Sequence, residues 1–386
     1  MVTVTTTTAL TVARTGRPFG RALQVIIAAM CVVAAGYPSF VTHPITLLAP
    51  VPLLVALVLL DEGRLTRPIW IALSGALVTW TTLLYLAMDG TATGLGHSLA
   101  MYAPFAALAF RIKRPERIAI AVAIGTSMLL CIRMLASFVR AGAEWAPWQI
   151  YEGNDMSARL NALLPVVLVG FLAVPRDRRW LRGLLLALIA TGIVCVVLAQ
   201  QRAGLGLLVA LIVLGLVRTN WRWLIVIVAA AAAAWLMASD SIVSVLERVR
   251  LVGFTPSNAS RPEIWDVAIE NLRRSSWLGV GPGNSADALR EVGNVHAHNN
   301  LVQTALEAGW PGALAAAGLT VYVIILAARL LWRDGHNTLW ALSLLAYLGF
   351  SMISSPIVRP DFSLVLVLVI MVGRERVGTR GDPCDP

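Results

Sequence analysis

Charged residues are scarce in this chain, and this scarcity argues against an ordinary soluble globular protein. Asp, Glu, Lys and Arg make up 13% of the 386 residues, and hydrophobic residues make up 58%. A soluble chain usually carries about 25% charged residues. The apolar residues form blocks of roughly twenty, the length that a membrane-spanning helix needs. The alternating segments of about ten residues that are typical of a β-barrel are missing. The sequence therefore predicts an all-α polytopic membrane protein.

Cysteine and lysine are also rare. The four cysteines (Cys31, Cys131, Cys195 and Cys384) have no spacing that suggests a disulfide or a zinc site. Lys113 is the only lysine, so the net charge of +10 comes from arginine. Such a charge in a soluble protein would suggest nucleic acid. Membrane topology accounts for it here, and no nucleic-acid partner is expected.

Twelve apolar blocks predict twelve spans. The polar, basic N-terminus precedes a block that we interpret as a retained first helix and not as a removed signal peptide. The expected spans are 22–37, 44–60, 69–88, 95–110, 117–136, 160–174, 181–200, 203–217, 222–238, 312–331, 338–354 and 361–373.

The distribution of basic residues predicts the orientation of these spans. With the N-terminus inside, the inner segments hold 20 Arg and Lys residues and the short outer loops hold 4. Positive charge favours the cytoplasmic side, so both termini are expected there. The chain then divides into three expected parts. Residues 1–238 hold nine spans, residues 239–311 form an external loop of short helices, and residues 312–386 hold three spans and a cytoplasmic tail.

An arginine stands at the start of one predicted helix of the long loop. In 260–275, Ser260 and Glu263 form a capping-box pattern, and apolar residues recur every four positions. Arg261 falls in the first helical turn, where free N–H groups and the helix dipole favour phosphate. The alternative is a solvated surface arginine.

Two further arginines lie in or beside apolar blocks. Arg202 is expected at the outer end of the seventh span, where it either snorkels to lipid phosphates or holds an anionic headgroup. Arg133 lies inside the fifth block, where an ion pair and a substrate contact are both open. The polar stretch 151–159 is expected to form the outer loop before the sixth span.

Two histidines precede the tenth span. His296 and His298 form an H-x-H pair, a weak metal signal without further ligands. A histidine can also accept a proton from a hydroxyl group, or have no chemical role. The preceding Gly-rich stretch 279–284 is expected to be a turn, since neither a strand nor a nucleotide-binding register accompanies it.

A longer motif surrounds His298. His298 and Asn299, nine further residues, then Gly309 and Gly312 match the H[NSQ]-x9-G-x-x-G pattern of the O-antigen ligase and polymerase superfamily, which this chain resembles. Other family-like pieces are Gly153-Asn154, Arg202, and Arg261 with Trp265 ahead of 279–284. The residue before Arg202 departs from the family, which more often has Ser or Thr there.

The resemblance implies a metal-independent, GT-C-like glycosyltransferase without a cofactor. It would move a glycan from a polyprenyl diphosphate donor to a lipid or glycan hydroxyl at the outer face of a bacterial inner membrane, in lipopolysaccharide or other cell-envelope polysaccharide assembly. By the resemblance and the chemistry of the residues, His298 is expected to be the base, and Arg202 and Arg261 to hold the diphosphate. The expected supporting residues are Asn299, Gly309, Gly312 and His296.

Other functions stay open at this point. The motif fits a ligase and a polymerase equally. A transporter or flippase of lipid-linked glycans would show ionisable residues inside the bundle and two related halves, of which the sequence offers only Arg133. A peptidoglycan polymerase of the shape-elongation-division-sporulation type would need an acidic residue as the key group of its long loop.

Overall fold

The computed structural model describes residues 115–141, 153–199, 202–219, 260–275, 277–293, 296–333, 335–352 and 360–378, with single positions at 79, 82, 83, 108, 222 and 225. Every regular element in these ranges is a helix, which confirms the all-α class there. The first four predicted spans, the ninth span and residues 239–259 lie almost wholly outside the described residues.

Seven predicted apolar blocks coincide with helices. Within the described residues, four helices are long and apolar enough to cross a membrane, namely α6, α7, α8 and α13. The full count of twelve spans stays a prediction. The seven helices are α6 (Pro115–Ala141), α7 (Gly153–Ala173), α8 (Arg179–Leu198), α9 (Arg202–Thr219), α13 (Asn300–Leu331), α14 (Asn337–Ser351) and α15 (Pro360–Gly378).

One predicted boundary is wrong. The expected outer loop 151–159 is helical from Gly153, so α7 starts about two turns before residue 160. Arg159 lies inside this helix with 3% of its surface exposed. Its charge suggested a loop, but burial of its neighbours Met156 and Ala158 draws the segment into the bundle. Tertiary packing here overrides the local polarity.

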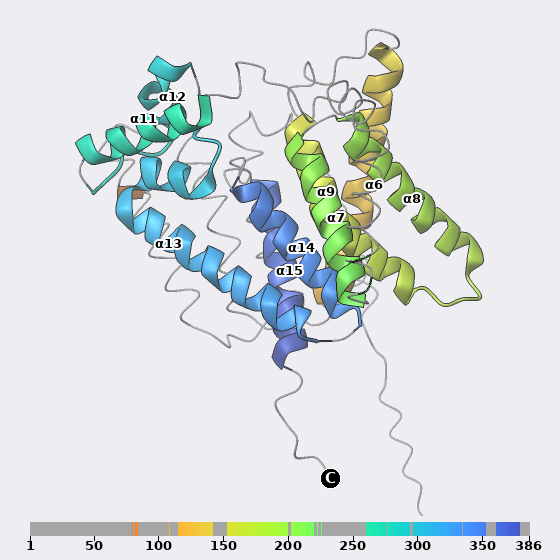
Figure 1. Ribbon diagram of the computed structural model, residues 1–386. Helices are drawn as coiled ribbons and strands as arrows, with labels where there is room; N and C mark the ends of the chain where they lie inside the picture. Colours follow the sequence, from red (N-terminus) through yellow and green to blue (C-terminus); the bar gives the residue numbers. More distant parts are fainter. Residues whose placement is uncertain are drawn as a thin grey trace, which may run out of the picture.

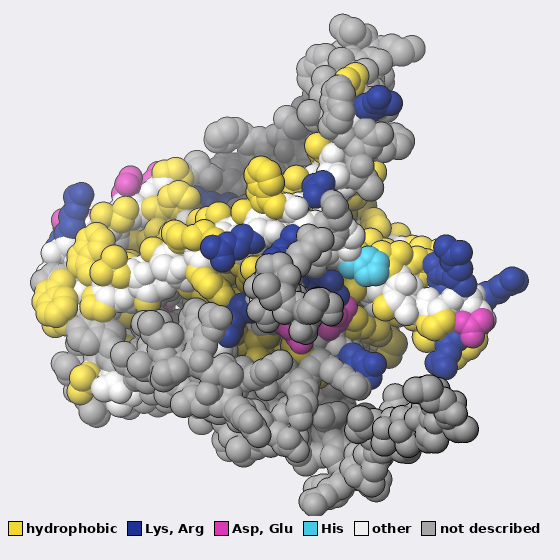
Figure 2. Space-filling model, turned by 90° about the horizontal axis from the view of Figure 1, so that it is seen from below, with side chains coloured by type: hydrophobic (Ala, Val, Ile, Leu, Met, Phe, Trp, Pro, Cys, Tyr) yellow, Lys and Arg dark blue, Asp and Glu magenta, His cyan; other side chains and the backbone are white. Residues whose placement is uncertain are grey.

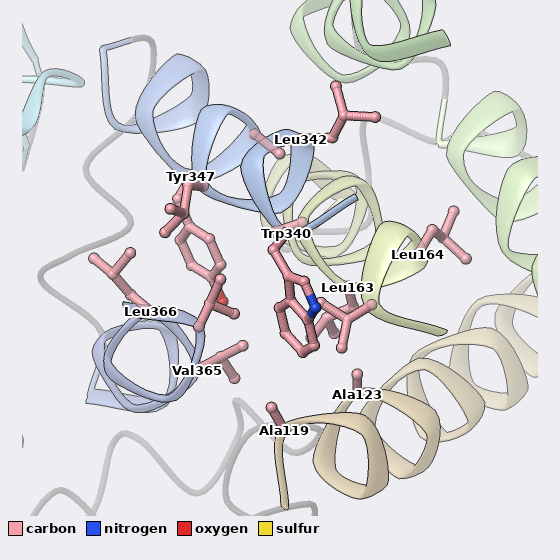
Figure 3. Packing of buried hydrophobic residues seen from close by; sticks show 14 of the residues in the cluster. Ala119, Ala123, Leu163, Leu164, Trp340, Leu342, Tyr347, Val365 and Leu366 are labelled. Carbon is pink, nitrogen blue, oxygen red and sulfur yellow. The ribbon is translucent and has the colours of Figure 1, made fainter. Parts of the chain in front are cut away.

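The bundle is built around α7, which packs against α6, α8, α9 and α14. Trp340 of α14 is fully buried, and its indole ring points toward Ala119 and Ala123 of α6 and Leu163 of α7 (Figure 3). Small residues allow helices to approach closely, which matters in a membrane because lipid is as apolar as the helices. The alanines of α6 therefore provide room for the ring.

Two polar bonds fix α7 to its neighbours. The Asn161 side-chain amide donates to the Gly204 carbonyl of α9 at 2.8 Å. The Ser343 hydroxyl of α14 donates to the Ala162 carbonyl at 2.6 Å. Each bond is worth about 0.6 kcal/mol in a membrane helix bundle, and together they set the positions of α9 and α14 along α7.

Arginine side chains tie the helix ends together where α15 finishes. Arg376 of α15 donates to both carboxylate oxygens of Glu116 of α6 at 2.7 Å, and to the Asn337 side chain at 3.1 Å. Arg218 at the end of α9 donates to the Leu331 carbonyl of α13 at 2.6 Å. Seen from this end, dark blue arginine side chains lie among large apolar surfaces (Figure 2).

A small layer of helices covers the N-terminal end of α13, away from the end that contacts Arg218 (Figure 1). It consists of α11 (Ser260–Arg274), α12 (Ser285–Ala288) and a short 3-10 helix (Arg290–Val292). The layer has a hydrophobic core of its own, separate from that of the bundle. This core contains Ile264, Ala268, Leu289, Ala297 and Leu306.

Candidate functional site

The histidine turn, which we define as residues 296–299, leads directly into α13. Asn299 caps the helix: its side-chain oxygen accepts from the backbone N–H groups of Leu301 at 2.9 Å and Val302 at 3.2 Å. The same side chain donates to the Met352 carbonyl at the end of α14, at 3.3 Å. Asn299 therefore fixes the backbone beside His298 to two helices of the bundle.

His298 has an unusual backbone conformation. Its φ of 51° is the one positive value at a non-glycine residue of the described chain. L-residues adopt this left-handed region rarely and at a cost, although His and Asn tolerate it better than most. The side chain of His298 is half-buried, whereas His296 is exposed. Backbone strain of this kind persists only where surrounding contacts impose it.

Two side chains hold the peptide groups on either side of Ala297, the residue between the histidines. The Trp265 indole N–H donates to the Ala297 carbonyl at 2.8 Å. The Ala297 N–H donates to the Gln303 side-chain oxygen at 2.8 Å. Ala297 is fully buried. The turn is thus held from α11 on one side and from α13 on the other.

Arg261 stands one helical turn before Trp265 on α11, so the indole bond ties its helix to the histidine turn. The predicted apolar face of α11 is confirmed, because Ile264, Ala268 and Leu272 are all buried. Arg261 is half-buried, and this burial lowers the pKa of its guanidinium below the usual value. A partly desolvated guanidinium interacts more strongly with an anion than a fully hydrated one.

A glycine strap, residues 277–284, crosses α13 at a kink. The Val280 N–H donates to the Leu306 carbonyl at 2.7 Å, and the Trp310 N–H donates to the Trp277 carbonyl at 2.9 Å. Gly309 has φ 66° and ψ −164°, a conformation open essentially to glycine alone. A Cβ atom there would lie 2.1 Å from the Trp277 carbonyl oxygen. The strap therefore requires glycine at the kink.

Gly312 makes a second close approach, just beyond the kink. A Cβ atom on Gly312 would lie 2.5 Å from the Cβ atom of Ala308. The helical run from Asn300 is interrupted at Gly309, and Pro311 follows two residues later. Proline lacks the N–H that the first turn of a helix leaves unpaired, so it fits just after the kink. The two motif glycines shape the passage from the histidine turn into the apolar part of α13.

Arg202 is the first residue of α9, and its side chain lies outside the described residues. The bond from Asn161 to Gly204 holds this helix start against α7. Figure 1 shows the starts of α7 and α13 and the end of α14 toward the upper end of the bundle, with α11 and α12 above the start of α13. Arg133 is partly buried in α6.

Glu307 lies one hydrogen-bonded side chain away from the histidine turn, and the sequence analysis did not predict it. Its carboxylate accepts from the Gln303 amide at 2.7 Å, and also from the Ser285 side chain and the Gly283 backbone. It is the one acidic residue between Asn300 and Leu331. A lone acid in an apolar helix, four residues after a glutamine, is the signal that could have drawn attention to it.

Residues 185–317 match the family model of the O-antigen ligase, Wzy_C. This match covers 133 of the 386 residues and supports the O-antigen ligase superfamily. The matched segment includes Arg202, Arg261, His298 and both motif glycines. No curated protein matches the chain. The matched family model implies an O-antigen ligase-like or polymerase-like role in polysaccharide assembly, and the apolar helices suggest a membrane protein.

Proposed function

We propose that this protein transfers a glycan from a polyprenyl diphosphate carrier to a hydroxyl acceptor. The observation that carries the proposal is the bond from Trp265 to Ala297, which ties the helix of Arg261 to the turn of His298. A phosphate-binding group and a proton acceptor are what this reaction needs, because the diphosphate already activates the sugar.

The proposed chemistry is a displacement at the anomeric carbon. The acceptor oxygen forms a bond to this carbon, and the bond between the carbon and the diphosphate oxygen breaks. The diphosphate leaves with the electron pair, and the imidazole of His298 takes the proton of the acceptor hydroxyl. A positioned base of this kind contributes roughly 10²- to 10⁴-fold to a rate.

Arginine side chains stabilise the leaving group in this proposal. Arg261 at the start of α11 and Arg202 at the start of α9 bind the diphosphate, on which negative charge grows as the bond breaks. A guanidinium matches phosphate oxygens with two parallel donors. Asn299, Gly309 and Gly312 support the histidine turn and the kink, and His296 is a neighbour. No metal or cofactor is required by this chemistry.

The proposed setting is the outer face of a bacterial inner membrane, with both termini cytoplasmic and residues 239–311 external. The loop would then meet the lipid-linked donor at the membrane surface. Labelling of single-cysteine variants with a thiol reagent that does not cross membranes tests this orientation. A cysteine in 239–311 should be labelled from outside, and a cysteine in either terminus should not.

Reconstitution tests the reaction. The full chain in lipid vesicles is given a fluorescent polyprenyl diphosphate oligosaccharide, with and without a second glycolipid acceptor. One larger product that requires the acceptor indicates a ligase, and a ladder from the donor alone indicates a polymerase. Movement of the donor across the bilayer with no covalent product would contradict the proposal and favour a flippase.

His298→Asn is the sharpest variant, because asparagine tolerates the left-handed backbone but does not act as a base at neutral pH. We expect loss of transfer at a normal amount of membrane-inserted protein. Full transfer by this variant would remove His298 from its role.

A further inference from the structure

A hydrogen-bonded chain of side chains joins Glu307 to the backbone of the histidine turn. The Gln303 side chain stands between them. Its oxygen accepts from the Ala297 N–H at 2.8 Å, and its NH2 group donates to the Glu307 carboxylate at 2.7 Å. Gln303 and Ala297 are both buried. This hydrogen-bonded chain therefore runs from α13 to the His296–Ala297 peptide, one residue before His298.

Only one orientation of the Gln303 amide satisfies both neighbours. A backbone N–H can only donate, so the Gln303 oxygen must face Ala297. The NH2 group then faces Glu307 and donates to its carboxyl oxygen at 2.7 Å. A rotated amide would place its oxygen against a carboxylate and its NH2 against an N–H group. The carboxylate of Glu307 therefore selects the orientation that holds Ala297.

Glu307 is itself held by the glycine strap and by the first residue of α12. Besides Gln303, the Ser285 side chain and the Gly283 backbone N–H donate to it. Gly283 has φ 82°, and the left-handed conformation of this glycine belongs to the turn that presents its N–H. Three donors from two separate segments thus converge on one carboxylate. Buried polar networks in which every member has a partner rigidify the structure around them.

The histidine turn needs such support. His298 adopts φ 51°, which a free loop would seldom keep. Trp265 secures the carbonyl of Ala297, Gln303 secures its N–H, and Asn299 caps α13 on the other side of His298. The contact of Gln303 depends on a further acidic group, Glu307.

We propose that Glu307 is a positioning residue that acts through Gln303 to hold the His298 backbone in its left-handed conformation, and thereby to aim the imidazole at the acceptor. The inference rests on the proposed function, because it assumes that His298 is the base. Glu307 does not touch the substrate in this proposal. Its replacement therefore slows the chemical step and leaves donor binding intact.

A swap of the two side chains provides the test. In Gln303→Glu two carboxylates face each other, and in Glu307→Gln an NH2 group faces the donors of Ser285 and Gly283. The double variant Q303E/E307Q restores the pattern in reverse. The new carboxylate at position 303 accepts from the Ala297 N–H and from the NH2 group of the new amide at position 307. The oxygen of that amide accepts from Ser285 and Gly283. We expect kcat to fall at least 10-fold in Q303E and less in E307Q, and to recover in the double variant to within about threefold of the natural chain.

The Michaelis constant for the fluorescent donor, the amount of inserted protein and its thermal midpoint are measured beside kcat. Glu291→Gln, an exposed acid of the same layer, is the matched control and should keep full activity. Unchanged kcat in both single variants would overturn the positioning role, as would losses in kcat and protein amount that the swap does not reverse.

The two proposals fail differently. An active His298→Asn variant removes the base and with it the proposed function. An inactive His298→Asn variant beside fully active Gln303→Glu and Glu307→Gln variants removes only the positioning role. Recovery in the swap variant, with an unchanged Michaelis constant throughout, supports the inference.

Discussion

Trp265 of α11 donates its indole N–H to the backbone carbonyl of Ala297, 32 residues later, at 2.8 Å. This bond joins the helix that begins beside Arg261 to the turn that contains His298. Trp265 follows Arg261 by four residues, which is about one turn of α11. At this position its indole lies on the side of the helix that faces the histidine turn.

Trp265→Phe should loosen this connection without emptying the space that the ring fills. The Ala297 carbonyl then lacks its partner, which costs about 1–3 kcal/mol for a buried group. A displacement of about 1 Å in a site can slow a reaction 10²-fold, so we expect a 10- to 100-fold lower transfer rate. The rate is measured with the fluorescent lipid-linked donor in vesicles.

Trp332→Phe is the matched control, since this tryptophan is 87% exposed and lies at the far end of α13. It should transfer at the normal rate. An equal loss in both variants would show that the indole of Trp265 has no special part in the site.

Gly309→Ala should destabilise the protein strongly. The methyl group would lie 2.1 Å from the Trp277 carbonyl oxygen, and alanine rarely adopts φ 66°. Strain of this kind costs about 1–3 kcal/mol from the backbone alone. We expect less inserted protein and a lower midpoint of thermal aggregation.

Gly318→Ala tests whether that loss comes from the kink. Gly318 lies in the same helix, and a Cβ atom there meets nothing within 4 Å. Alanine favours a helix over glycine by about 0.8–1 kcal/mol, so this variant should match or exceed the natural chain in stability. A similar loss in both variants would contradict the role of the strap.

The sequence predicted the apolar helices well because their signal is local. A block of about twenty apolar residues favours a spanning helix whatever lies around it. Its ends are less certain, as Arg159 shows: charge suggested a loop, whereas packing placed the residue inside α7. The apolar face of α11 was also predictable, because a four-residue repeat is a local pattern.

The support of the histidine turn could not be predicted in the same way. Glu307 is reached by donors from Gly283 and Ser285, which lie more than twenty residues earlier in the chain. Their convergence depends on how the strap crosses the kink at Gly309. The motif spacing identified His298 and Gly309, but not the side chains that join them.

Arg261→Lys should weaken the use of donor while leaving the fold intact. Lysine keeps the charge but loses the two parallel donors that match a phosphate, so we expect about a 10-fold higher Michaelis constant for donor. Burial lowers the pKa of Arg261, yet arginine stays charged at all ordinary pH values. The same burial would also lower the pKa of a lysine from its usual value of about 10.4, so R261K should lose donor affinity as pH rises through that lowered pKa.

The measurement for Arg261→Lys is the Michaelis constant for donor between neutral and alkaline pH. Arg273→Lys, an exposed arginine on the same helix, serves as its control. Equal pH dependence in the two variants would argue against a special environment at Arg261.

The ion pair between Arg376 and Glu116 should contribute to stability and not to catalysis. It lies at the end of the bundle opposite the histidine turn, and both side chains are partly buried, at 26% and 33% exposure. A double-mutant cycle with Arg376→Ala and Glu116→Ala measures its coupling free energy. We expect about 1 kcal/mol, above a typical exposed pair because the geometry is bidentate and Asn337 shares the guanidinium. Arg117→Ala, an exposed neighbour on α6, should change little. All these variants should transfer glycan at the natural rate when corrected for the amount of protein, because the pair sets the docking of α15 on α6, far from the turn that holds His298.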